Sequence, residues 1–305
     1  MSMQRQKAAA AVNRLSSTPA ARELVPSDPE LSGRWHRHGV PSPYSRWNYH
    51  PEYEVHLIRV GTGRYIVGDH IDTFVAGQLV LVGSNVPHHW ISDLQPGEVI
   101  EDRDVVFQFH ADWIRQCQVV LPELVDVNTL LKRSACGIEF LGATARAGAE
   151  EVEAIGETSG AKRLQHVFAL LAVLASAPRS EYRTLGNAWL PPTDNHAGAE
   201  IIDRAFGFIL QHLRADLSLS ATAAVVGMSD SAFSRTFKRT SGQTFSDTVR
   251  KLRLAEACKL LRDTDLPIAA VCDRVGYTNL SNFNRQFRRQ HGVTPSQYRS
   301  QERRR

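Results

Sequence analysis

The chain of 305 residues has few of the features that mark exported, membrane-bound or disulfide-linked proteins. It contains only four cysteines and no CxxC pair, a pattern that fits a reducing compartment better than a disulfide framework. It has no apolar run of about eighteen residues, the length that a membrane-spanning helix needs. Its first thirty residues lack the continuous apolar stretch of a secretory signal. We therefore expect a cytoplasmic protein with no membrane partner.

The sequence also lacks a Ser/His/Asp or Cys/His arrangement of the kind that activates a nucleophile, which argues against an enzyme of that class.

Charge is unevenly distributed along the chain. From position 200 onward 18 Lys and Arg face 10 Asp and Glu, whereas the rest of the chain has 18 against 22. A basic C-terminal third predicts a polyanionic partner for that third, and a solvated charged face is the alternative on charge alone.

The N-terminal part has the pattern of a β domain. Between about 45 and 110, short apolar runs alternate with period two and are interrupted by glycine. Such spacing predicts a small β-sandwich or barrel. The expected strands are Val55–Val60, Arg64–Val67, Ile71–Val75, Leu79–Val82 and Val105–Phe109.

Helical periodicity follows from about 111 to 177. The segment 160–174 carries apolar residues at 164, 167, 168, 171 and 174, a stripe that packs on its own barrel or on a second subunit. Residues 178–198, which include Pro191-Pro192, predict an exposed linker, and residues 1–30 a mobile arm. Everything from about residue 200 predicts helices.

Two stretches near the C-terminus share one spacing. In each, a small-residue helix stops at a glycine, a polar cap follows, and a second helix carries Phe at i and i+4. The first stretch runs from Gly227 to Phe233 and Phe237, and the second from Gly276 to Phe283 and Phe287. This is the outline of a helix-turn-helix written twice, which predicts a single reader of adjacent major grooves.

The faces of the two second helices opposite the phenylalanines carry long donors and small polar residues, which suit base recognition in the major groove. The predicted DNA-binding residues are Ser231, Ser234, Arg235, Lys238, Ser281, Asn282, Asn284, Arg285 and Arg288. Of the neighbouring arginines, Arg288, Arg289 and Arg299 suit phosphate contacts or solvated charge better than base contacts. A helix from Thr244 to about Arg262 is predicted between the two units; its roughly eighteen residues span about 27 Å.

The run from Ala255 to Ile268, followed by Val275-Gly-Tyr, Ser281-Asn-Phe-Asn-Arg-Gln-Phe and Gly292-Val-Thr-Pro-Ser-Gln-Tyr, resembles the signature of the AraC/XylS family of transcriptional regulators. The resemblance implies a seven-helix DNA-binding domain with two helix-turn-helix units, double-stranded DNA as a partner, and RNA polymerase as a further partner if the protein is an activator.

The segments His50-Pro-Glu-Tyr-Glu-Val-His, Gly61-Thr-Gly and Gly77 to His88 resemble the cupin-type sensor domain of the same family. The resemblance implies an α+β multidomain chain: a cupin-like β-barrel with helices, and a C-terminal all-α domain. The expected boundaries are an N-terminal arm at 1–30, an effector-binding and dimerisation domain at 31–177, a linker at 178–198, the DNA-binding domain at 199–300 and a basic tail at 301–305. A homodimer is expected.

Three interpretations of the cupin motif remain open. The first is a divalent metal held by His50, Glu54 and His88, against which Asn48 stands where the motif has its first histidine. The second is a metal-free effector pocket lined by His50, Glu54, His88, Trp47 and Trp90. The third is structural histidines, the role also expected for His56 and His89.

The leading hypothesis is a cytoplasmic, sequence-specific transcriptional regulator that a small molecule modulates. The family resemblance favours a sugar or sugar derivative as that effector. The alternative is a metal-dependent cupin enzyme, such as an isomerase or dioxygenase, with an accessory DNA-binding module.

Overall fold

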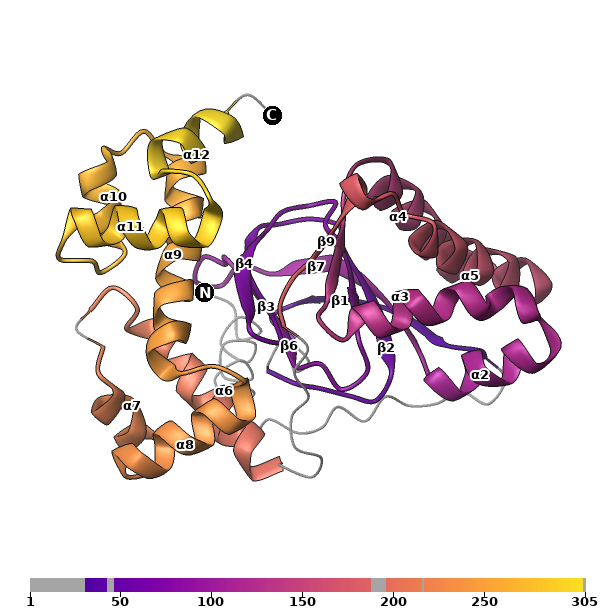
Figure 1. Cartoon of the computed structure of the whole chain (residues 1–305), viewed down its shortest axis with the longest axis horizontal. Helices are drawn as coiled ribbons and strands as arrows, with labels where there is room; N and C mark the ends of the chain where they lie inside the picture. The colour runs from indigo at the N-terminus through magenta and orange to yellow at the C-terminus, as the bar shows by residue number, and fades with distance from the viewer. Residues whose placement is uncertain (1–30, 43–46, 188–195, 216, 304–305) are drawn as a thin grey trace. The chain divides into compact units, whose positions relative to one another are not determined.

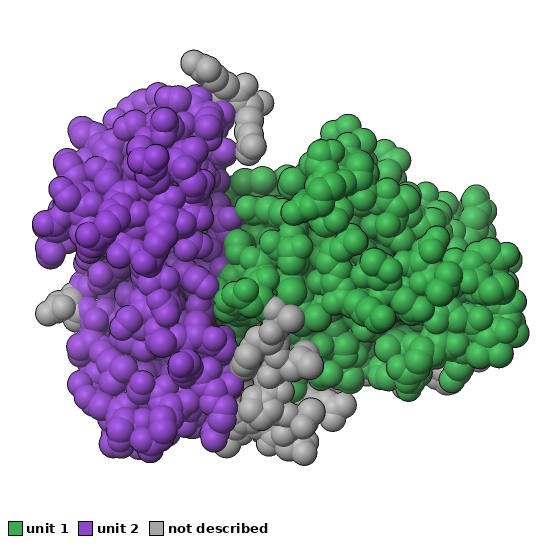
Figure 2. Space-filling view, viewed as in Figure 1, with its two compact units in different colours: residues 1–70, 74–200 green, residues 71–73, 201–305 purple. Residues whose placement is uncertain are grey.

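The computed structural model describes residues 31–42, 47–187, 196–215 and 217–303, and the predicted arm at 1–30 lies outside them. The chain divides into two compact units, each described here by itself. The first comprises residues 1–70 and 74–200, and the second comprises residues 71–73 and 201–305 (Figure 2).

The first unit contains two antiparallel sheets (Figure 1). The larger has the strand order β1-β7-β2-β5-β8-β9 and the smaller β4-β3-β6. The bounds are β1 Arg34–Val40, β2 Tyr53–Ile58, β3 Gly63–Val67, β4 His70–Phe74, β5 Leu79–Val82, β6 His88–Ser92, β7 Ile100–Phe109, β8 Ile138–Phe140 and β9 Tyr182–Thr184. The five predicted strands are present, but the sheets do not close on one another, so the predicted cupin barrel is not confirmed.

The period-two pattern of the strands divides the large sheet into two faces. On β2, Val55 and Leu57 face one way, where they join Phe107 of β7 in an apolar core covered by helices. Glu54 and His56 face the other way, toward a second core that includes Tyr65 and Trp90 of the small sheet. The sheet alternation therefore places buried polar groups between the two sheets.

Helices cover the apolar face of the large sheet. They are α2 Ala111–Val120, α3 Val127–Ser134, α4 Gly142–Glu157 and α5 Gly160–Ala175, with short 3-10 helices η1 Pro122–Asp126 and η2 Arg179–Glu181. The stripe predicted on α5 is rotated: Leu164 is 39% exposed, whereas Arg163 and Leu170 are buried. Arg163 is buried because its guanidinium donates to the Gly33 carbonyl at 2.7 Å and lies 5.9 Å from the Phe107 ring centre.

The predicted linker at 178–198 is wrong in its first part. Residues 179–184 form η2 and β9, and β9 pairs with β8 at the edge of the large sheet. Side chains hold the strand there, since Arg183 donates to Glu139 at 2.5 Å and the Tyr182 ring packs on the apolar core. Residues 188–195 lie outside the described part of the chain, and α6 begins at His196.

The second unit has seven helices within the described ranges 196–215 and 217–303, as the family resemblance implies (Figure 1). They are α6 His196–Gln211, α7 Leu219–Val225, α8 Asp230–Ser241, α9 Phe245–Asp263, α10 Ile268–Arg274, α11 Leu280–His291 and α12 Pro295–Glu302. Side chains cap three of these helices: the hydroxyls of Ser218, Ser229 and Thr244 accept hydrogen bonds from the backbone of the first turn. Gly227 and Gly276 follow α7 and α10 with φ of 72° and 82°, the left-handed conformation that favours glycine.

Among the described residues, no helix has both the length and the apolar composition that crossing a membrane requires.

Candidate DNA interface and polar centre

His50, Glu54 and His88 come together between the two sheets of the first unit. Their ligand atoms lie within 4.8 Å of one another, and all three side chains are buried. Backbone hydrogen bonds between Asn48 and His88, of 3.0 and 3.2 Å, fasten the segment before β2 to β6 and so bring His50 beside His88. Asn48, which stands at the position of the motif's first histidine, therefore positions the segment through its backbone.

Both histidines of this polar centre face Glu54 with Nε2. His50 Nδ1 lies 3.2 Å from the Glu52 carbonyl oxygen and His88 Nδ1 lies 2.9 Å from that of Val86. A carbonyl only accepts, so these contacts place the hydrogen on Nδ1 and leave Nε2 as a lone pair. Nε2 of His50 is 3.0 Å, and that of His88 is 3.7 Å, from the Glu54 carboxylate. Two lone pairs repel at 3.0 Å, so the geometry requires a proton or a cation between His50 and Glu54.

Glu54 also accepts hydrogen bonds from His56 Nδ1 and from Gln108 Nε2, both at 2.9 Å. Burial raises the pKa of Glu54, but in the acid range, where the imidazoles are protonated, the charge of His88 and the hydrogen bonds from His50 and His56 outweigh it and hold that pKa well below its usual value. Burial lowers the pKa of His88 to about 4, which keeps its imidazole neutral near pH 7. A buried carboxylate thus faces at least one neutral imidazole.

The network continues past His56, which the sequence analysis assigned a structural role. Its Nε2 lies 2.9 Å from the Asp104 carboxylate, which also pairs with Arg103 and His38. Burial lowers the pKa of His56, but Asp104 and Glu54 outweigh this and raise it above its ordinary value. Alternation on the strands was the signal for this extension, because Glu54 and His56 are two residues apart on β2 and face the same way.

The two predicted aromatic walls are both buried, Trp47 at 1% and Trp90 at 3% exposed. The Trp90 ring stacks on His56, with centroids 3.8 Å apart and planes 9° from parallel, and its Nε1 lies 3.4 Å from Gln78 Oε1. Trp90 therefore holds the imidazole of His56 flat against the polar centre.

In the second unit, α7 and α8 form the first helix-turn-helix. Phe233 and Phe237 are fully buried and pack on Phe206 and Phe245 with ring centroids 5.4–6.0 Å apart. The four predicted contact residues on the opposite face are all exposed: Ser231, Ser234, Arg235 and Lys238. The structure therefore leaves one short cationic face of α8 free for a ligand.

The second helix-turn-helix is formed by α10 and α11. Phe283 and Phe287 are fully buried, and the side chains predicted to read DNA lie on the outer face. Ser281, Arg285 and Arg288 are exposed, whereas Asn282 and Asn284 are half-buried. Arg285 Nη2 donates to Asn282 Oδ1 at 2.9 Å, so one arginine is oriented by an amide of the same face.

A family profile described as "Helix-turn-helix domain" matches residues 222–301. Regulatory protein SoxS of Escherichia coli (strain K12) is 35% identical over 100 residues, which cover 33% of this chain and 94% of SoxS. This chain belongs to the AraC family of helix-turn-helix transcriptional regulators.

Two further similarities also cover about a third of the chain. Regulatory protein PocR of Salmonella typhimurium is 36% identical over 98 residues, which cover 32% of each chain. The crystal structure of the DNA-binding domain of AdpA in complex with a target DNA is similar over 32% of this chain and 89% of that one, with 28% identity and a TM-score of 0.32.

In this AraC-family domain, the guanidinium of Arg299, which was considered for a phosphate contact, bonds within the fold. Its Nε donates to the Leu261 carbonyl at 3.3 Å and its Nη2 to the Leu266 carbonyl at 2.6 Å. The guanidinium thus ties α12 to the end of α9, a task that the sequence pattern did not reveal. Arg288 and Arg289 are exposed in the last turn of α11 and stay predicted DNA contacts.

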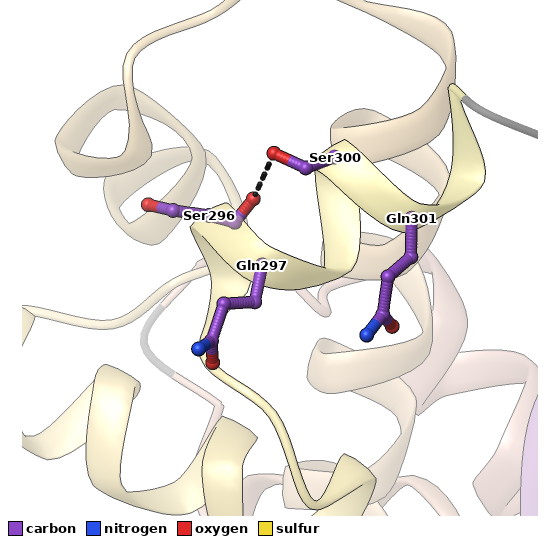
Figure 3. A pocket seen from close by; sticks show the side chains of 4 residues that line it. All are labelled: Ser296, Gln297, Ser300 and Gln301. Atoms are coloured by element: carbon purple, nitrogen blue, oxygen red, sulfur yellow. Dashed lines mark hydrogen bonds between the residues drawn. The ribbon is translucent and has the colours of Figure 1, made fainter.

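Two surface hollows lie outside these sites. One, of about 300 Å³, runs along α12 and is lined by Ser296, Gln297, Ser300 and Gln301 (Figure 3). Gln297 is committed to the helix, because its side chain accepts from the Thr294 backbone at 2.9 Å. The other, of about 550 Å³, lies beside α4, where the Arg59 guanidinium already donates twice to Glu153. Neither hollow brings together groups that suggest a reaction.

Proposed function

We propose that this AraC-family regulator reads a specific DNA sequence with both helix-turn-helix units and that a small molecule held in the first unit modulates this binding. The observation that carries the first part is the pair of exposed polar faces on α8 and α11, each backed by two buried phenylalanines. In each unit a long arginine stands among short polar neighbours, which suits bidentate contact with guanine at close range.

The helix between the two units supports reading of adjacent grooves. α9 has 19 residues and therefore extends about 28 Å, close to the roughly 34 Å of one DNA turn. Its first residue, Phe245, packs on Phe233 of the first helix-turn-helix. Leu254 to Leu261 pack in the core of the second helix-turn-helix. One continuous helix thus carries both reading helices.

We assign the effector site to the polar centre of the first unit, and we propose that residues 31–177 act as a cupin-type sensor. Its buried carboxylate, neutral imidazole and stacked indole offer oriented acceptors beside an apolar wall, a combination that suits a carbohydrate or sugar derivative. Effector binding changes DNA affinity only where it favours one conformational state over another. RNA polymerase contact and homodimerisation through the helices of the first unit complete the proposal.

The donor set of the polar centre fits a divalent cation. Two imidazole Nε2 atoms and one carboxylate converge, and each histidine has its Nδ1 fixed by a backbone carbonyl, the outer-shell arrangement that orients histidine ligands of metals. A bound cation would place a positive charge between His50 and Glu54, which is one of the two ways, beside a proton, to relieve the 3.0 Å approach of their lone pairs. It would then supply a Lewis-acidic contact for an effector oxygen.

Two measurements test this proposal. Sequencing of the genomic DNA that the purified full chain retains, with and without candidate sugars, should recover one motif whose enrichment changes with an effector. Metal analysis and thermal melting with added Mn²⁺, Ni²⁺ or Zn²⁺ test the cation. At one hundred times Kd a single-site cation stabilises the fold by about 2.7 kcal/mol.

The matched variants for both measurements are Glu54→Gln and Glu139→Gln. Both carboxylates are buried on the same sheet, but Glu139 binds Tyr65, Gln78 and Arg183 rather than the histidines. Loss of the metal or effector response in the Glu54 variant alone supports the assignment. Equal responses in the two variants and the wild type exclude the polar centre as the site.

A further inference from the structure

Arg253 lies in the middle of α9 and contacts both the segment that leads from α6 into the first helix-turn-helix and the turn of the second. On the side of the first helix-turn-helix, the Nε of Arg253 donates to the Leu213 carbonyl and its Nη2 to the Ala215 carbonyl, each at 3.0 Å. Both carbonyls belong to the segment that follows α6, which ends at Gln211. The planar guanidinium fits two such acceptors at once, which a lysine ammonium does not.

On the side of the second helix-turn-helix, the same guanidinium lies against the turn after α10. A Cβ added to Gly276 would fall 3.0 Å from both Cζ and Nη2 of Arg253. The next residue, Tyr277, packs its ring on Phe283 of α11, with centroids 5.3 Å apart. The guanidinium therefore touches a turn that is packed directly on the second reading helix.

The two helix-turn-helix motifs bury separate groups of aromatic side chains along α9. Phe233 and Phe237 of α8 pack on Phe245 at its start, whereas Phe283 and Phe287 of α11 join the cluster around Leu254 to Leu261. A second polar contact joins the segment after α6 to the same part of α9: Arg214 donates to the buried Glu256 at 2.8 Å. Arg253 is three residues earlier and so lies on the same side of the helix.

We propose that Arg253 is a positioning residue that locks the first helix-turn-helix against the turn of the second, and thereby sets the spacing between the two base-pair groups that the protein recognises. This inference rests on the proposed reading of DNA by both units. Moving one half-site by a single base pair shifts it by about 3.4 Å and rotates it by about 35° around the duplex. If the Arg253 contacts hold the two helix-turn-helix motifs rigidly, both cannot bind the shifted half-sites at once. Without the guanidinium, the two motifs can move relative to each other and bind both half-sites.

The experiment uses the full chain and a duplex that the wild type selects from a randomised library. Affinity is measured for that duplex, for versions with one base pair inserted or removed between the half-sites, and for a single half-site. We expect the wild type to lose at least about tenfold in affinity on either change of spacing. Arg253→Met should bind the three spacings within about threefold of one another while keeping the wild-type affinity for the single half-site.

The matched control is Arg262→Met, which removes one charge from the same helix and whose guanidinium donates to the adjacent Asp263. It should keep the wild-type spacing preference. If Arg253→Met fails to fold, Arg253→Lys is measured in the same way, since it keeps the charge and loses the paired donation. Retained spacing preference, or parallel loss of half-site affinity, in a folded Arg253 variant overturns the inference. Absence of any spacing preference in the wild type instead refutes the proposed reading by two units.

Discussion

Arg285 offers the sharpest test of which residues read bases. It is exposed on α11, and its Nη2 donates to Asn282 Oδ1 at 2.9 Å. The backbone N–H of Asn282 is in turn capped by Asn279 Oδ1 at 2.8 Å. The remaining guanidinium donors are thus presented from an oriented side chain in the middle of the reading helix. Arg285→Ala should weaken binding to the selected duplex and relax preference at one base pair.

The size of the effect follows from the contact. A bidentate arginine–guanine pair contributes about 1–3 kcal/mol to discrimination, which corresponds to a loss of about 5- to 150-fold. Asn282→Ala leaves the arginine in place but unoriented. Restricting one long side chain costs about 0.5–1.5 kcal/mol. Asn282→Ala also removes the predicted base contact of Asn282 itself, so the comparison is made at the Arg285 base pair, where preference should relax less than in Arg285→Ala.

Fluorescence anisotropy with the selected duplex and its three single-base variants at the Arg285 position measures both effects. Arg289→Ala is the control, because Arg289 is exposed in the last turn of the same helix. It should weaken binding equally to all four duplexes and reduce the slope of log K against log salt by about one. A uniform loss in Arg285→Ala would refute the reasoning and make Arg285 a phosphate contact.

Three further predictions concern the fold. Burial raises the pKa of Asp247, but Thr244 and Arg250 outweigh it and the pKa is lowered, so Asp247 stabilises the fold above about pH 4 and loses this contribution as pH falls through the lowered pKa; the stability difference from Asp247→Asn, measured by urea unfolding, should vanish at low pH. Gly156→Ala should lower stability by about 1–3 kcal/mol, because the added Cβ would lie 2.2 Å from the Trp35 ring; unchanged urea unfolding would contradict this. Burial raises the pKa of Cys258 well above its usual value, so native protein should expose no fast-reacting thiol at that position; peptide mapping after alkylation checks this.

Local signals predicted the second unit more completely than the first. Ser229 and Thr244 cap α8 and α9 as expected, and Gly227 and Gly276 end the preceding helices in the left-handed conformation. Each of these is a short-range effect, decided by a side chain and a backbone group within a few residues. Fold and motif could therefore be predicted together over this part of the chain.

The first unit depends on contacts between distant residues. β8 and β9 are three residues long, and their pairing brings Glu139 and Arg183 together across 44 positions. Such short strands give no periodic signal of their own, which explains why the segment with β9 was predicted as linker. The same limit applies to the polar centre: the motif identified three of its residues, but not Asp104 on β7, which is 48 positions from His56.

The two reading helices have unequal chemistry. α11 combines Arg285 with two asparagines, and one of these already orients the arginine, so this face offers matched donors for guanine and adenine. α8 carries Arg235 and Lys238 among serines, with Asp230 at its first turn bonded to Ser220. A serine hydroxyl can both donate and accept a hydrogen bond, so it discriminates weakly between bases. We therefore expect the base sequence of the half-site read by α11 to be the more strictly defined. The first helix-turn-helix, with α8, contributes affinity and spacing. Equal information content in the two halves of the selected motif would contradict this division.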